Sequence, residues 1–195
     1  MKSIKDSDFK LLVPDDNQFK YQAELTKKLD KLTDNFDQAT LNEIVLWKVN
    51  RYAELTPELI NQLNSIKKSD TTINEALTRT ILRGLLGTKG IQLPMASTIL
   101  RFKNPKIYQI IDQRVFRIIY GKKLHLGYNQ NSKKSEEQID IYLMYLNDLK
   151  RISIELGIKF ELSDRILFMA DKRVNKDISL DNYSSKNKDE MEPEY

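Results

Sequence analysis

The sequence predicts an all-α protein, and three observations support that prediction. Apolar residues recur at helical spacing through most of the 195 residues. No stretch alternates apolar and polar residues between turn signals, as a half-buried strand does. Six glycines and five prolines are few for this length, which disfavours a turn-rich β sandwich. We therefore expect residues 1–174 to form one helical unit of one or two lobes.

The composition excludes several classes of protein. A hydrophobic fraction of 40% supports a core, and the 31% of charged residues interrupt every apolar stretch before it could span a membrane. With no cysteine and one histidine, disulfides and thiolate chemistry are excluded, and neither a metal nor a cofactor is predicted. The charged start MKSIKDSDFK is unlike a secretory leader, so a cytoplasmic location is expected.

The first two predicted helices follow an N-terminal arm that ends in a turn at 14–16. One helix is expected over about 17–33. The next has an apolar stripe that Leu46 and Trp47 widen, so this helix is predicted to be mostly buried. The stripe consists of Leu41, Ile44, Val45, Val49 and Tyr52.

Helix-capping signals place the remaining helices. Thr56 before Pro57 opens a helix to about residue 67. Capping boxes at Thr72 with Glu75 and at Ser135 with Gln138 open two more, which close at Gly87 and Gly157. Ser163 is the expected cap of a last helix that ends near residue 173, with Leu162 and Leu167 as a hydrophobic staple. Residues 175–195 carry a net charge of −3 and are predicted to be a disordered acidic tail.

Positive charge is concentrated between residues 79 and 125. This segment holds ten basic residues and one acid, Asp112, a net charge of +9 against +4 for the whole chain. Such a zone is either a solubilising surface or a site for a polyanion. The polyanion is favoured because solubilising surfaces mix the two signs, as this chain does elsewhere.

The segment 85–103 predicts two helices joined by a short turn at 88–92. A glycine-containing turn that opens a helix exposes backbone N–H groups at the positive end of the helix dipole, where a phosphate binds. Lys89 lies in the turn, and Arg83 and Arg101 flank it, so a contact to a nucleic-acid backbone is predicted. The alternative is an ordinary connection that binds nothing.

Asp112 precedes an amphipathic helix that starts at Gln113, and it is therefore an N-cap candidate. The functional alternative is a carboxylate that the helix dipole keeps ionised beside a polyanion site. There it would stabilise a cationic sugar-like transition state or orient a water molecule.

The stretches GIQLPMASTIL and YQIIDQRVFRII resemble the helix-hairpin-helix DNA glycosylase superfamily. In that comparison Gly90-Ile91-Gln92 takes the place of the hairpin G-x-G, and Ala96 and Leu100 take the helix positions after it. Asp112 falls on the catalytic aspartate. The resemblance covers about 37 of the 195 residues and implies a two-lobed all-α fold that binds DNA at the hairpin and flips a base into a cleft.

The chain departs from the family in three places. Pro94 stands where bifunctional members carry the lysine that forms a Schiff base, which excludes lyase chemistry by that route. Gln92 replaces the second hairpin glycine, and there is no cysteine cluster for an iron–sulfur centre. Lysine-free members act as monofunctional glycosylases, in which the aspartate supports departure of the base and water completes hydrolysis.

A weaker set of candidates for a base pocket comes from the second helix, because an aromatic side chain can stack on a flipped base. The alternative is that the two aromatic residues belong to the core. The set is Trp47, Lys48, Arg51 and Tyr52.

Two functions from different classes follow. The leading one is double-stranded DNA binding in the manner of these glycosylases, with monofunctional base excision in which Gly90, Ile91, Gln92, Lys89, Arg83 and Arg101 hold DNA and Asp112 is catalytic. The other is a non-catalytic adaptor that retains the fold and binds DNA or protein. A third possibility is that the basic zone binds an acidic protein and that nucleic acid is irrelevant. The damaged base and the oligomeric state stay open.

Overall fold

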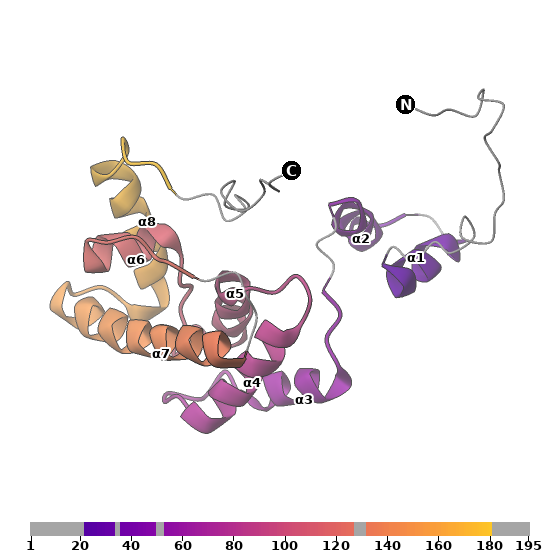
Figure 1. Ribbon diagram of the computed structural model, residues 1–195, viewed down its shortest axis with the longest axis horizontal. Helices are drawn as coiled ribbons and strands as arrows, with labels where there is room; N and C mark the ends of the chain where they lie inside the picture. The colour runs from indigo at the N-terminus through magenta and orange to yellow at the C-terminus, as the bar shows by residue number, and fades with distance from the viewer. Residues whose placement is uncertain (1–21, 34–35, 50–52, 127–131, 181–195) are drawn as a thin grey trace, which may run out of the picture. The chain divides into compact units, whose positions relative to one another are not determined.

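The computed structural model describes residues 22–33, 36–49, 53–126 and 132–180, and within these ranges the protein is all-α (Figure 1). They contain eight helices and no strand, which confirms the predicted fold class. No helix among them is long and apolar enough to cross a membrane. The helices are α1 Ala23–Asp30, α2 Gln38–Lys48, α3 Pro57–Ser65, α4 Glu75–Gly87, α5 Leu93–Lys103, α6 Gln113–Tyr120, α7 Ser132–Glu155 and α8 Phe160–Val174.

The chain divides into two compact units, Met1–Glu54 and Leu55–Tyr195, which we call the N-terminal unit and the C-terminal unit. The N-terminal unit holds α1 and α2, and the C-terminal unit holds α3 to α8. The boundary after Glu54 falls just before Thr56 and Pro57, the residues that open α3.

In the N-terminal unit, α1 and α2 pack against each other around Trp47. The indole Nε1 of Trp47 donates a hydrogen bond to Thr26 Oγ1 at 2.8 Å, and its carbonyl accepts one from Gln22 Nε2 at 3.1 Å. Leu25 of α1 is buried. The side chain of Asp37 caps α2 by accepting from the backbone N–H of Thr40 at 2.7 Å.

The prediction that the second helix is mostly buried was wrong. None of the residues of α2 is buried, and the side chain of Val45 is 58% exposed. The reason is geometric: apolar residues surround α2, and the eight-residue α1 packed against it within this unit covers one side only.

In the C-terminal unit, the core forms around α4, which contacts α3, α5 and α7. The inward stripe of α4 is Thr78, Ile81, Leu82, Leu85 and Leu86, at the spacing of one helix face. The tyrosines 142 and 145 of α7 are fully buried and donate their hydroxyl hydrogens to the carbonyls of Gln109 and Ile110. Helix α6 packs most extensively against α8.

Two of the predicted helix ends are confirmed by hydrogen bonds. Thr56 Oγ1 accepts from the backbone N–H of Leu59, with Pro57 in the first turn of α3. Gly157 has a φ of 64°, and its N–H donates to Ile154 O, so it ends α7 in the left-handed conformation that favours glycine.

Three predicted helix starts were wrong by two to four residues. Asn74 caps α4 in place of Thr72, because the Asn74 carboxamide accepts from Leu77 N at 3.0 Å. Helix α7 begins at Ser132, before Ser135. Helix α8 begins at Phe160, which packs on the core, and Ser163 is buried within the helix with its hydroxyl donating to Phe160 O.

The first residues of the predicted tail, 175–180, make hydrogen bonds to the helices. Asn175 donates to Asp171 Oδ1 at 2.7 Å, and the carbonyl of Ile178 accepts from Arg117 at 3.1 Å. Residues 175–180 are thus connected to α6 and α8, and residues 181–195 lie outside the described ranges.

The connection between α5 and α6 is fixed by Asn104, which is fully buried. Its Nδ2 donates to the carbonyls of Lys67 at 2.7 Å and Asp70 at 3.0 Å, and its Oδ1 accepts from Lys106 N at 2.9 Å. One side chain therefore holds the loop after α3 against the loop after α5.

Substitution Asn104→Ala should lower the free energy of unfolding by about 3 kcal/mol, because it removes three hydrogen bonds that this fully buried side chain makes to two carbonyls and one N–H. Urea unfolding of the variant measures the loss. The matched control is Asn147→Ala on an exposed face of α7, for which we expect a change within about 0.5 kcal/mol. Equal stabilities of the two variants would show that Asn104 is not a structural clamp.

Candidate nucleic-acid interface

The turn between α4 and α5 has the predicted length and a fixed shape. Gly90 has a φ of 87°, and a Cβ built on it would meet nothing within 4 Å, so this glycine faces open space. Ile91 points the other way: it is 1% exposed, and its N–H donates to Thr88 O at 3.1 Å. The buried isoleucine anchors the turn, while Lys89, Gly90 and Gln92 are exposed.

Helix α5 starts at this turn without a side-chain cap. Gln92 is its N-cap residue, and the Gln92 side chain accepts no hydrogen bond from the first turn. Pro94 in that turn has no N–H and Leu93 is 0% exposed, so Met95 is the exposed residue of this turn that carries a backbone N–H. The uncapped end of α5 and the Lys89 ammonium belong to the same short segment, an arrangement that attracts an anion.

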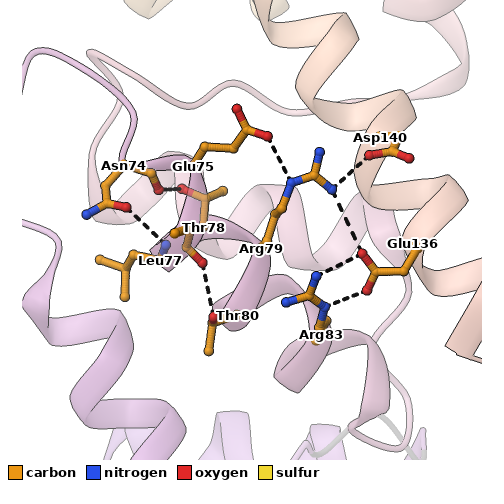
Figure 2. A network of polar contacts seen from close by, with 10 residues as sticks. Asn74, Glu75, Leu77, Thr78, Arg79, Thr80, Arg83, Glu136 and Asp140 are labelled. Carbon is orange, nitrogen blue, oxygen red and sulfur yellow. Dashed lines mark hydrogen bonds and ion pairs between the residues drawn. The ribbon is translucent and has the colours of Figure 1, made fainter.

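Arg83 is paired with a carboxylate of the protein itself. Figure 2 shows that Arg79 and Arg83 of α4 point toward Glu136 and Asp140 of α7. Arg83 makes two hydrogen bonds to Glu136, and these bonds hold the pKa of the Glu136 carboxyl below its usual range. Arg79 lies 2.8 Å from Asp140 Oδ1 and 2.9 Å from Glu75 Oε1. These ion pairs join α4 to α7, and they engage Arg83, one of the cations for which a phosphate contact is predicted.

Arg101 is not placed to contact DNA. It is 7% exposed, its Nη2 donates to Glu161 O at 3.1 Å, and its Nε lies 3.9 Å from Asp164 Oδ2. Burial therefore makes Arg101 a link between α5 and α8, which is a correction to the predicted contact set. The predicted phosphate contact of the Ile91 N–H is corrected as well, since that group is used within the turn.

Asp112 is the N-cap of α6, as the sequence predicts. Its Oδ1 accepts from Val115 N at 2.8 Å. Burial raises the pKa of the Asp112 carboxyl above its ordinary value, and the backbone hydrogen bonds from Val115 and Arg114 offset only part of this effect. Desolvation is therefore the larger effect on this pKa. The side chain is half-buried.

A chain of hydrogen bonds connects the residue before Asp112 to the start of α5. The N–H of Ile111 donates to Ser97 Oγ at 3.2 Å, and the Ser97 hydroxyl donates to Pro94 O at 2.8 Å. The helix that begins at the hairpin and the cap of α6 are therefore held together within the C-terminal unit. Ser97, which is fully buried, is a positioning residue that no motif in the sequence points to.

The weaker base-pocket candidates belong to the N-terminal unit. Trp47 is half-buried and uses its indole N–H within that unit, and Lys48 is exposed at the end of α2. Arg51 and Tyr52 lie outside the described residues. Within the described ranges no group of three histidine, aspartate or glutamate side chains is placed to hold a metal ion.

Substitution Asp112→Asn separates the capping role from a catalytic one, because asparagine caps a helix as well as aspartate does. Because the folded-state pKa of Asp112 is raised, ionisation of its carboxyl group opposes folding as the pH rises from the unfolded-state pKa through the folded-state pKa. We therefore expect Asp112→Asn to keep or slightly raise the free energy of unfolding at pH 7, whereas Asp112→Ala loses about 1 kcal/mol. Thermal unfolding of both variants at pH 7 checks this order, and an asparagine variant as unstable as the alanine variant would contradict it.

No protein-family model, curated protein or solved structure matches this chain.

Proposed function

We propose that the C-terminal unit binds the backbone of double-stranded DNA at the 88–92 turn and the first turn of α5. The observation that carries the proposal is the exposed Lys89-Gly90 pair beside a helix start that no side chain caps. A backbone phosphate would accept from N–H groups of the turn and of α5, and the Lys89 ammonium would neutralise its charge. The resemblance of this segment to the helix-hairpin-helix hairpin supports the same assignment.

Such a contact reads no base, so the binding should be indifferent to sequence. Fluorescence anisotropy of two labelled duplexes of equal length and unrelated sequence tests this. We expect saturable binding of both at low salt, with affinities within about threefold of each other. Absence of binding to either duplex at low ionic strength would overturn the proposal.

A second candidate function is monofunctional base excision with Asp112 as the catalytic carboxylate. The specific observation in its favour is the pair of hydrogen bonds that links Ile111 to Ser97 and Ser97 to Pro94. These bonds hold the residue before Asp112 against α5, the helix that follows the hairpin turn. A carboxyl group with a raised pKa suits the handling of a proton or a water molecule. In the proposed reaction Asp112 stabilises the sugar cation as the base leaves, and water attacks the sugar.

Duplexes that contain uracil, an alkylated base or an oxidised base test this candidate by the appearance of abasic sites. The wild type should produce them from at least one duplex, and Asp112→Asn should lose that activity while it keeps its fold. Equal amounts of product from the two proteins would show that Asp112 is not the catalytic residue, even if the protein binds DNA.

The alternative to the enzyme is an adaptor that binds DNA or protein without chemistry. Pro94 favours it, because this residue cannot supply the nucleophile that bifunctional glycosylases use. Sequence-indifferent binding with no product from any damaged duplex is the result expected for the adaptor.

A further inference from the structure

A groove of about 260 Å³ lies in the C-terminal unit at the start of α4, away from the hairpin. Its walls come from the loop before α4, the connection after α5, the middle of α7 and the first residue of α8. The lining residues are Thr71, Thr72, Ile73, Glu75, Lys106, Ile107, Leu143, Leu146, Asn147, Lys150 and Phe160.

The groove has an apolar floor and a polar rim. Ile107, Leu143 and Leu146 are buried members of the core, and Phe160 is packed against that core. Lys106, Asn147 and Lys150 are exposed at the rim. An occupant would thus meet aliphatic and aromatic carbon at its inner end and ammonium, amide and hydroxyl groups at its outer end.

The charge at the rim is positive. Among the described residues no carboxylate lies within ion-pair distance of Lys106 or Lys150. The one acid that lines the groove, Glu75, accepts a hydrogen bond from Arg79 Nε at 2.9 Å. The rim therefore offers two ammonium groups to a ligand and one carboxylate that is already paired.

We propose that this groove binds a small amphipathic anion, an apolar body that carries one acidic group. The apolar part would lie over Leu143, Leu146 and Phe160, and the acidic group would face Lys106 and Lys150. The volume is just below the usual range for drug-sized ligands, about 300–1,000 Å³, so it suits a body of one or two rings or a short chain.

The groove and the hairpin are separate sites on the same unit. Glu75 is the first residue of α4, and the 88–92 turn follows its last residue, so the length of α4, roughly 20 Å, lies between them. The inference therefore does not depend on DNA binding.

The probe is 8-anilino-1-naphthalenesulfonate, an aromatic anion whose fluorescence rises in apolar surroundings. Substitution Asn147→Trp should fill the groove from the exposed face of α7 and reduce probe affinity at least tenfold. The matched control is Met144→Trp, on the same helix at an exposed position that does not line the groove. Unfolding curves establish that both variants are folded. Equal probe affinity in the two tryptophan variants would overturn the site.

A second comparison tests the acidic group. The double variant Lys106→Ala, Lys150→Ala should bind the sulfonate about tenfold more weakly, and it should bind the uncharged analogue N-phenyl-1-naphthylamine as the wild type does. Equal sulfonate affinity of the double variant and the wild type would overturn the anionic part of the proposal. Lys89→Glu should leave probe binding unchanged, so failure of this inference and failure of the DNA proposal are distinguishable.

Discussion

Substitution Asp171→Ala should lower the free energy of unfolding by about 3–5 kcal/mol, the largest effect that we expect of any single change on stability. Asp171 is 0% exposed and accepts hydrogen bonds from Arg117 Nε at 2.9 Å and Nη2 at 2.7 Å. Arg114 and Asn175 donate to the same carboxylate at 3.2 Å and 2.7 Å. Alanine would leave the buried Arg117 guanidinium without its counter-charge between α6 and α8.

Urea unfolding at pH 7 measures this loss, with Glu155→Ala as the matched control. Glu155 pairs with Arg151 on the exposed surface of α7, where an ion pair contributes little. A double change of Arg117 and Asp171 to methionine and leucine should recover much of the stability, because no buried charge is left unpaired. If Asp171→Ala loses no more than Glu155→Ala, the cluster does not stabilise the fold.

The same carboxylate predicts the acid limit of stability. Burial alone would raise the pKa of Asp171, but the hydrogen bonds from Arg117, Asn175 and Arg114 outweigh it, so the pKa lies below its ordinary value of 3.8. A group with a depressed folded-state pKa stabilises the fold above its unfolded pKa and loses that contribution as the pH falls below about 4.

Substitution Lys89→Glu should weaken duplex DNA binding about tenfold at low salt, the largest effect that we expect of a single change on binding. Under the proposal, the variant replaces an attractive contact to phosphate with a repulsive one beside the exposed Gly90. Fluorescence anisotropy with one duplex measures the change.

The matched control is Lys133→Glu, which alters the net charge by the same amount on an exposed residue of α7. Its affinity should stay within about threefold of the wild type. If both variants lose affinity equally, the loss reflects net charge, and the 88–92 turn has no special part in binding.

Local signals in the sequence predicted most of the helices, because caps and turns depend on near neighbours. Thr56, Asp112 and Gly157 each act within four residues, and the structure has them in the predicted roles. Where two residues could cap the same helix, the local pattern does not show which one does. Asn74 caps α4, although Thr72 and Glu75 have the spacing of a capping box. The exposure of α2 was also missed, since a stripe shows that a helix is apolar and does not show how much surface a partner covers.

The candidate site was harder to predict than the fold, because charges pair over long distances along the chain. Arg83 meets Glu136, which lies 53 residues later, and Arg117 meets Asp171, which lies 54 residues later. Arg101 is buried against α8. The segment 79–125 therefore has less free positive charge than its composition suggests, and the exposed Lys89 at the turn becomes the main cation of the proposed interface.

The salt dependence of duplex DNA binding tests the proposed interface most directly. Each phosphate contact on duplex DNA contributes about 0.9 to the slope of log affinity against log salt. We expect a clear negative slope for the wild-type protein and a slope shallower by about 1 for Lys89→Glu. Affinity that does not change with salt would contradict a phosphate contact at the turn.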